Sequence, residues 1–270
     1  MYEDLKSKVA VVTGGGGALC GAISEALADL GTKVAILDIS SDACNRKADE
    51  IAASGGQAIG IQCDALDKAG VERAVETVMA KYGRLDILIN GAGGSRKECT
   101  TSPELTFFDM SPTDISSVLA LNYMSAVIPS QVVGAIFADR QAGVILNITS
   151  IAGISPLTNT IAYSNGKAAA NSFTQWLAVH MARTYSPNIR VNAIAPGFVL
   201  TQQNRFLMVD ENTGEMTERA KAVIANVPMA RFGEPKEIVG CVLWLVSDSA
   251  SFVTGAIVPV DGGYTAFSGV

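Results

Sequence analysis

The chain has 270 residues with a formal net charge of −6, and 49% of its residues are hydrophobic. This length can bury a large core, and no composition break divides residues 1–270, so we expect a single domain. The acidic balance and the lack of a basic run argue against nucleic acid or an anionic membrane as a partner. Five scattered cysteines without a C-x-x-C motif favour reduced thiols in a cytoplasmic protein. We expect neither a signal peptide nor a membrane span, since no stretch reaches the roughly 20 apolar residues that a membrane span needs.

The first predicted elements surround a run of four glycines. Residues 9–12 form an apolar run that predicts a buried strand, and residues 18–30 have the apolar spacing of a helix. A strand, a glycine turn and a helix together bring backbone N–H groups and a helix N-terminus against a diphosphate. A flexible turn is the alternative. The candidate cofactor residues here are Gly14, Gly16, Gly17, Ala18 and Leu19.

The next strand, residues 33–39, carries Asp38 near its carboxyl end. An acid at this position can accept hydrogen bonds from the hydroxyls of an adenosine ribose, and it would repel a 2′-phosphate. Asp38 therefore favours NAD over NADP. The alternative is that Asp38 only caps the helix predicted for residues 41–54.

Strands and helices continue to alternate along the chain, with strands at 57–62 and 85–90 and a helix at 68–82 between them. This alternation predicts right-handed crossovers and an α/β fold, a doubly wound parallel sheet of the Rossmann type in three layers. Ligands in such sheets bind at the carboxyl ends of the strands. The further cofactor candidates at these ends are Asp64, Asn90, Ala92 and Gly93.

Two polar segments are expected to lie over the mouth of the site. Residues 95–110 are poorly periodic, and Arg96 and Lys97 are candidates for holding a substrate carboxylate, although they could equally form a solvated corner. The second segment, residues 201–225, carries Arg205. We prefer Arg205 as the carboxylate clamp because an arginine can bind a carboxylate through two hydrogen bonds. A surface charge is the competing interpretation.

Two long predicted helices each carry a notable polar residue. Asn122 lies inside the apolar helix 112–140, where its amide needs partners, so it either bonds structurally or positions a water. His180, on the helix 160–185, follows Trp176 by one helical turn. We expect this histidine to pack at a helix or subunit contact instead of serving as a catalytic base.

A possible proton-transfer group lies between the strand at 144–148 and the following helix. Tyr163 and Lys167 are four residues apart, so on a helix they share one face, and Ser150 lies upstream in the loop after the strand. A nearby cation favours the phenolate and would lower the pKa of Tyr163. A tyrosine and a lysine at this spacing also occur by chance on surface helices. The remaining predicted elements are a strand at 189–194 ending at Pro196 and Gly197, a helix at 235–246 and a strand at 257–260.

Taken together, these motifs make the sequence resemble the short-chain dehydrogenase/reductase family over its whole length. Ser150 and Tyr163 are 13 residues apart, as is usual in that family. One departure lies in the nucleotide signature T-G-x-x-x-G-x-G, whose later glycines fall on Ala18 and Cys20. The residues that carry the resemblance are 13–17, 90–93, Asn122, Ser150, Tyr163, Lys167, 196–197, Thr201 and 261–263.

The resemblance implies a role for each matching residue. Tyr163 would exchange a proton with the reacting oxygen, Ser150 would hydrogen-bond that oxygen, and Asn122 would hold a water in the relay. Lys167 would stabilise the phenolate and, with Tyr163, hold the nicotinamide ribose. The remaining implied cofactor contacts are Pro196, Gly197, Val199 and Thr201. No metal is implied, and the family resemblance suggests a homotetramer.

A narrower similarity is to a bacterial subgroup of this family, the D-mannonate oxidoreductases, also called fructuronate reductases. It is carried by the sequences TGGGGALCGA, SFTQWLAVHMA, NAIAPGFVLTQQNR and FVTGAIVPVDGGYTAFSGV. This similarity implies hydride transfer between NAD(H) and a small sugar acid, interconverting D-fructuronate and D-mannonate. The alternatives are a gluconate 5-dehydrogenase, a 3-oxoacyl thioester reductase, or a nucleotide-sensing protein without catalysis.

Overall fold

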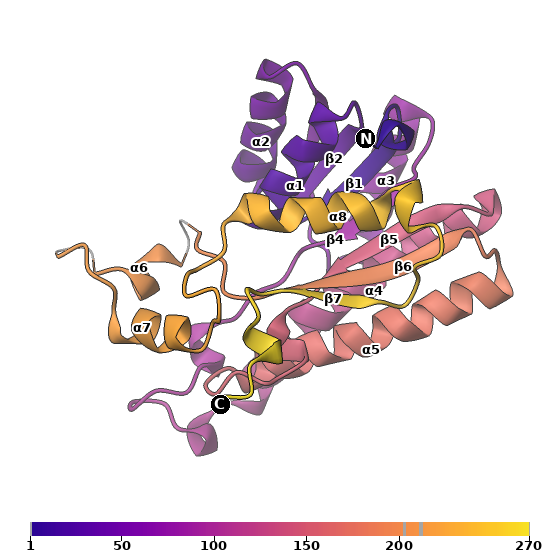
Figure 1. The fold of residues 1–270 in the computed structure, drawn as a ribbon. Coiled ribbons are helices and arrows are strands. Elements are labelled where there is room, and N and C mark those ends of the chain that lie inside the picture. Colours follow the sequence, from indigo (N-terminus) through magenta and orange to yellow (C-terminus); the bar gives the residue numbers. More distant parts are fainter. Residues whose placement is uncertain (1, 202–203, 211–212, 270) are drawn as a thin grey trace.

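The computed structural model describes residues 2–201, 204–210 and 213–269. Within these residues the strands form one seven-stranded parallel sheet in the order β3-β2-β1-β4-β5-β6-β7 (Figure 1). This order confirms the predicted doubly wound α/β fold. The strands are β1 (Val9–Thr13), β2 (Lys33–Asp38), β3 (Gln57–Gln62), β4 (Ile87–Asn90), β5 (Gly143–Ile148), β6 (Ile189–Pro196) and β7 (Ile257–Val260).

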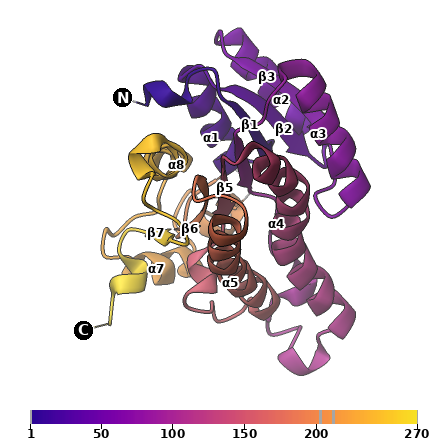
Figure 2. The ribbon, with the colours of Figure 1, turned by 90° about the vertical axis from the view of Figure 1, so that its right-hand side faces the viewer.

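Helices cover both faces of the sheet (Figures 1 and 2). One apolar cluster joins the sheet to α1, α2 and α8, and a second joins the opposite face to α3, α4 and α5. The short helices α6 and α7 project beyond the carboxyl ends of the strands (Figure 1). The helices are α1 (Ala18–Asp29), α2 (Ser41–Ala53), α3 (Lys68–Tyr82), α4 (Pro112–Arg140), α5 (Ile161–Thr184), α6 (Arg205–Met208), α7 (Glu218–Ala225) and α8 (Val239–Val246).

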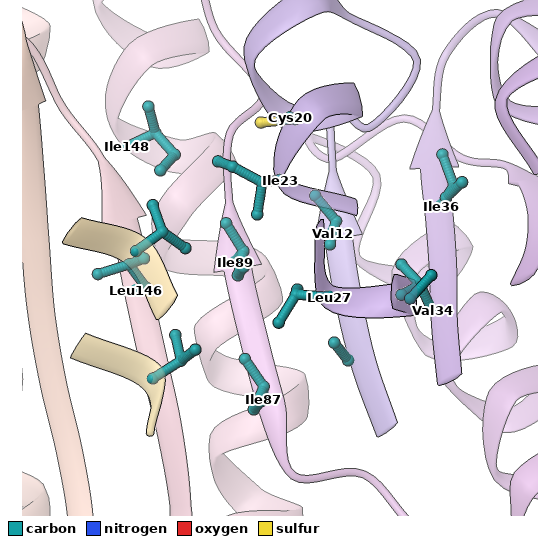
Figure 3. Packing of buried hydrophobic residues seen from close by; sticks show 14 of the residues in the cluster. Val12, Cys20, Ile23, Leu27, Val34, Ile36, Ile87, Ile89, Leu146 and Ile148 are labelled. Atoms are coloured by element: carbon teal, nitrogen blue, oxygen red, sulfur yellow. The ribbon is translucent and has the colours of Figure 1, made fainter. Parts of the chain in front are cut away.

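The core is divided by the sheet because successive side chains of a strand point to opposite faces. In β1, Val12 packs with Ile23 and Leu27 of α1, whereas Val11 belongs to the cluster on the other face. Figure 3 shows α1 lying over β1 and β4, with Ile89 pointing toward it. Burial on both faces explains why these strands are continuous apolar runs.

Most predicted boundaries hold to within two residues, and two need correction. The strand predicted at 85–90 begins at Ile87, because the side chain of Asp86 accepts a hydrogen bond from Val9 N at 2.9 Å. The helix predicted at 235–246 opens as the 3-10 turn η5 (Pro235–Ile238), and α8 follows it.

The helix α4 is long and apolar enough to cross a membrane by length and composition. Its residues Val118, Val133 and Phe137 are nevertheless fully buried inside the protein, and it lies beside α5 (Figure 2). We therefore interpret α4 as a core helix of the sheet-covering layer.

Candidate active site

The glycine turn after β1 has the geometry of a diphosphate cradle. Gly14 has a φ of +64°, and a Cβ there would lie 2.9 Å from Ala92 N, so only glycine fits. Gly17 is the N-cap of α1, and no side chain caps the first helical turn. The first-turn N–H groups, including those of Ala18 and Leu19, are therefore free to bind an anion. The predicted cofactor turn fits a dinucleotide.

The departure at Cys20 is accommodated by the neighbouring turn. Cys20 is 4% exposed, and a Cβ added to Gly91 would lie 2.0 Å from its Sγ. The thiol thus occupies space that a side chain at position 91 would need. Burial raises the pKa of Cys20 to about 12, so the thiol is protonated at neutral pH. A larger residue at position 20 is compatible with the turn because residue 91 is glycine.

A hydroxyl that the sequence analysis placed in the nucleotide signature, without assigning it a contact, joins the two turns. Thr13 Oγ1 accepts hydrogen bonds from Gly91 N at 3.1 Å and from Ala92 N at 3.3 Å. Thr13 is the last residue of β1 and Asn90 the last of β4, and the two are paired in register. The only sequence signal is that a threonine directly precedes the glycine run.

Asp38 lies at the end of β2 beside the glycine turn, as predicted. Its Oδ2 accepts a hydrogen bond from Gly16 N at 3.1 Å, and its Oδ1 accepts one from Ser40 N at 3.0 Å. The helix-cap alternative is wrong, because Ser40 is the N-cap of α2 and accepts from Ala43 N at 3.3 Å. Each Asp38 oxygen keeps acceptor capacity for a ribose hydroxyl.

Asp64 follows β3 at the same edge of the sheet and is exposed. Its Oδ1 accepts a hydrogen bond from Leu66 N at 2.9 Å, which fixes the turn before α3. The pairing of β2 with β3 extends to this turn, since Cys63 N donates to Asp38 O at 2.8 Å. The two acids therefore lie on neighbouring strand ends, where the adenosine half of a dinucleotide is expected.

Asn90 starts a buried network of polar side chains beneath the site. Its Nδ2 donates to Asn147 Oδ1 at 2.8 Å and to Ser130 Oγ at 3.0 Å. Asn147 Nδ2 in turn donates to Thr174 Oγ1 at 2.8 Å. These bonds join β4 and β5 to α4 and α5, so they fix the turn of Asn90 relative to both helices.

Ser150, Tyr163 and Lys167 meet at the carboxyl end of β5. The Ser150 hydroxyl hydrogen-bonds the Tyr163 phenol. Lys167 is 6% exposed, and its Nζ donates to Ile148 O at 2.8 Å and lies 5.8 Å from the centroid of the Tyr163 ring. The structure thus brings the three predicted groups together, with the lysine held by the last residue of the strand.

Burial dominates the acid–base properties of this group. It raises the pKa of Tyr163 above its ordinary value, and the hydrogen bond with Ser150 lowers it only in part. Burial also lowers the pKa of Lys167 to about 8. The expectation that Lys167 would depress the phenol pKa is therefore wrong in this structure. The reason is that desolvation penalises both charged forms, and the ammonium is directed to a backbone carbonyl.

Asn122 has partners for both ends of its amide. Its Oδ1 accepts from Gly94 N at 3.0 Å, and its Nδ2 donates to Gly94 O at 2.7 Å and to Val118 O at 2.9 Å. A Cβ on Gly93 would lie 2.8 Å from Asn122 Oδ1 and 3.3 Å from Lys167 Nζ. The glycine at position 93 therefore lets the second turn approach Lys167 and Asn122. Asn122 forms structural hydrogen bonds, and its role in positioning a water stays a prediction.

The residues after β6 close the same edge of the sheet. Gly197 N, next to Pro196, donates to Val260 O at 3.0 Å, and a Cβ on Gly197 would lie 2.7 Å from Asp261 Cα. Val199 is buried and forms a bridge with Gly233. Thr201 is partly exposed, and its N–H donates to Asn204 Oδ1 at 2.8 Å.

The three cationic substrate candidates lie in the two segments beyond the strand ends. Arg96, Lys97 and Arg205 are exposed, and none forms an ion pair within the described residues. Arg205 is the first residue of α6, while Arg96 directly precedes the 3-10 turn η2 (Lys97–Cys99).

His180 lies outside this group. Its ring stacks on Trp176, with centroids 4.8 Å apart and an interplanar angle of 9°. This contact agrees with the predicted packing role of His180. In the part of the protein that is described, no cluster of three or more His, Cys, Asp or Glu side chains could hold a metal ion.

Residues 17–265 match the family model described as Enoyl-(Acyl carrier protein) reductase. The protein is 43% identical over 279 residues to UxuB of Bacillus subtilis (strain 168), an uncharacterised oxidoreductase, covering 100% of this chain and 99% of that protein. The chain belongs to the short-chain dehydrogenase/reductase family. It is accordingly an NAD(P)-dependent oxidoreductase of the class that acts on CH–OH groups.

Two solved structures of this family are close in both sequence and fold. One is a candidate D-mannonate oxidoreductase from Haemophilus influenza with bound NAD, with a TM-score of 0.93 and 39% identity over 98% of both chains. The other is a candidate NAD(P)-dependent gluconate 5-dehydrogenase from Beutenbergia cavernae, with a TM-score of 0.85 and 31% identity over 99% of this chain and 100% of that one.

Proposed function

We propose that this short-chain dehydrogenase/reductase transfers hydride between NAD(H) and a sugar acid, interconverting D-fructuronate and D-mannonate. The observation that carries the chemistry is the Tyr163 phenol, hydrogen-bonded to Ser150 with the ammonium of Lys167 beneath it. The substrate class is supported by the similar Haemophilus protein. It is also supported by the exposed cations Arg96, Lys97 and Arg205, which have no ion-pair partner among the described residues although the protein is acidic.

The cofactor contacts follow from the strand ends. The turn of Gly14, Gly16 and Gly17 with the N–H groups of Ala18 and Leu19 would hold the diphosphate. Asp38 would accept from the ribose hydroxyls and disfavour a 2′-phosphate, so we propose NAD instead of NADP. The remaining proposed cofactor contacts are Asp64, Asn90, Ala92, Gly93, Tyr163, Lys167, Pro196, Gly197, Val199 and Thr201.

The cofactor supplies or accepts the hydride, and the protein orients the substrate and moves the proton. At neutral pH the raised pKa keeps the Tyr163 phenol protonated, so it can donate to a developing alkoxide during reduction. Ser150 would hydrogen-bond the same oxygen and fix its position. Lys167 holds a positive charge near the phenolate that forms, and its pKa of about 8 lets it retain that charge at neutral pH.

Asn122 would act through Gly94 in this scheme. Its three hydrogen bonds hold the segment after β4 against α4. That segment borders the Tyr163 group, so we propose that Asn122 sets the position of the substrate segment in addition to any water that it holds.

A second candidate is a gluconate 5-dehydrogenase, which the Beutenbergia structure favours because it has the same fold and is 31% identical to this chain. A 3-oxoacyl thioester reductase is less consistent with segment 95–110, whose first half is polar and includes Arg96 and Lys97. NADH oxidation by purified enzyme with D-fructuronate, 5-ketogluconate or an acetoacetyl thioester separates the three. Turnover of D-fructuronate with the highest kcat/KM is expected, and failure to turn over any uronate would refute the proposal.

Tyr163→Phe tests whether the protein is a catalyst or a nucleotide sensor. Loss of the phenol oxygen is expected to reduce kcat by roughly a hundredfold or more, because the phenol is the proposed proton donor. Binding of NAD should persist. Unchanged turnover in Tyr163→Phe would contradict the mechanism.

We also propose a cytoplasmic homotetramer. A groove of about 840 Å³ lies on the face made by α4 and α5, and Trp176 and Tyr185 in its lining are 59% and 45% exposed. A second copy of the protein packed on this face would remove these apolar side chains from water. The five free cysteines suit a reducing compartment. Light scattering at micromolar concentration is expected to give a tetramer, and a monomer would contradict this assembly.

A further inference from the structure

The segment that follows β4 is attached to the catalytic group at three points. At its start, Gly94 is held on both sides of its peptide by Asn122. Further along, the fully buried Cys99 packs in a small apolar cluster with Ala162 and the Tyr163 ring. Finally, Thr101 N donates to Asn159 O at 2.9 Å, just before α5. Residues 94–101 therefore form a fixed wall beside Tyr163.

Arg96 lies between the first two attachments, and its backbone is fixed. Its carbonyl accepts from Cys99 N at 3.1 Å and from Thr100 Oγ1 at 2.9 Å. Its side chain is exposed, and no acidic group within the described residues forms an ion pair with it. A guanidinium on a fixed backbone loses less freedom on binding than one on a loose loop, which favours tight recognition.

The charge of Arg96 acts on the buried thiol of Cys99. Burial raises the pKa of the Cys99 thiol, the carboxylates of Asp114 and Glu98 raise it further, and the guanidinium of Arg96 lowers it in part. Lys97, although it is the next residue, does not contribute to this balance. Arg96 is thus the cation of this segment whose charge acts on Cys99, the residue that packs in the cluster with Tyr163.

We infer that Arg96 binds the substrate carboxylate and sets the preference of the enzyme for sugar acids over neutral sugars. The inference rests on the proposed function and names the residue that recognises its substrate class. In an acyclic hexulosonate, hydroxylated carbons separate the carboxylate from the reacting carbonyl. The carboxylate is therefore expected to bind a cation on the wall beside Tyr163, at a distance from the phenol, when the carbonyl lies at the phenol. The planar guanidinium can hold both carboxylate oxygens at once.

Arg205, which the sequence favoured as the clamp, is attached differently. On one side of α6, Asn204 Nδ2 donates a hydrogen bond to Val199 O at 2.8 Å, in the turn at Thr201. On the other side, Met208 O accepts a hydrogen bond from Thr217 N at 3.1 Å, at the start of α7. None of these bonds reaches Asn122, Tyr163 or the turn before α5. The geometry therefore assigns carboxylate recognition to Arg96.

The test compares two substrates that differ only in the group being recognised. D-Fructose has a hydroxymethyl group where D-fructuronate has its carboxylate. In Arg96→Gln we expect the KM for D-fructuronate to rise roughly tenfold or more, with kcat little changed. The kcat/KM for D-fructose should stay within roughly twofold of wild type, which shows that the active site is intact. Arg96→Lys should recover part of the preference.

Lys81→Gln is the matched control, because it removes one positive charge from the carboxyl end of α3, at the opposite edge of the sheet. Lys81→Gln should leave the kcat/KM for both substrates unchanged. The assignment would be overturned if Arg96→Gln kept the wild-type preference for D-fructuronate over D-fructose. It would also be overturned if Lys97→Gln or Arg205→Gln lost that preference instead. Either result would leave the proposed function intact. A wild-type enzyme that reduces no sugar acid would refute the proposed function and the assignment together.

Discussion

Replacing Gly91 with alanine should destabilise the protein through two contacts, one with the thiol of Cys20 and one with the backbone of β1. The added Cβ would lie 2.0 Å from Cys20 Sγ and 2.9 Å from the carbonyl oxygen of Thr13, both closer than real Cβ contacts allow. Overpacking of this kind costs about 1–3 kcal/mol. Because one of the two atoms belongs to the backbone of β1, we expect Gly91→Ala to lower the free energy of unfolding by about 2–3 kcal/mol.

A second substitution separates the thiol from the backbone contact. Cys20→Ala alone should cost about 1 kcal/mol for the lost buried sulfur. In the double variant Cys20→Ala/Gly91→Ala, the nearest atom of residue 20 would be its Cβ at 3.6 Å, an ordinary contact. The two changes should therefore couple, so that the double variant is more stable by about 1–2 kcal/mol than the sum of the single changes predicts.

The assay is urea unfolding at one fixed protein concentration, since assembly makes apparent stability concentration-dependent. Cys44→Ala provides the control, because Cys44 is equally buried but lies on α2, away from Gly91. Cys44→Ala and Gly91→Ala should be additive. Additivity of Cys20→Ala with Gly91→Ala would refute the size complementarity of the two turns.

Three further outcomes are expected. The kcat/KM for reduction should be constant near neutral pH and fall as pH rises through about 8, where Lys167 loses its proton. The kcat/KM for oxidation should rise at higher pH, where Tyr163 ionises. A pH profile of both directions tests this, and a reduction rate that rises with pH would contradict it. Burial raises the pKa of Asp86, but hydrogen bonds from Arg84, Val9 N and Arg140 lower it more, so its net pKa is lowered and its stabilisation is lost as pH falls through that value. Asp86→Asn should therefore lose about 2–3 kcal/mol at neutral pH and show a flatter loss of stability in acid, measured by urea unfolding against pH; equal slopes for both proteins would be inconsistent with it. Asp38→Ser should shift the kcat/KM preference roughly tenfold or more toward NADP, and an unchanged preference would remove Asp38 from cofactor selection.

The features that the sequence predicted well are those set by local patterns. Apolar runs, glycine turns and helical spacing placed the strand ends, and parallel pairing then brought Asp38 and Asn90 to one edge of the sheet. Tyr163 and Lys167 needed only helical geometry to share a face. The motif residues of the candidate site lie where these rules put them.

The features that the sequence could not supply depend on side-chain direction in irregular segments. Nothing in the letters SRKECT shows that Cys99 turns inward to pack on Ala162 while Arg96 stays exposed. The complementarity of Cys20 and Gly91 requires the distance between two turns that are far apart in sequence. The rise in the pKa of Tyr163 depends on burial, and a sequence pattern of charges says nothing about how far a group is removed from water.

The segment 95–110 combines an anchored stem with an open tip. Cys99 and Thr101 tie its first half to the body of the protein, whereas Phe107 and Phe108 farther along are 60% and 90% exposed. Mutations at the tip can therefore accumulate without moving the stem. An evolving enzyme, or an engineer grafting a loop from a relative, can exchange residues 102–109 to admit a longer or bulkier molecule and still inherit the same reaction.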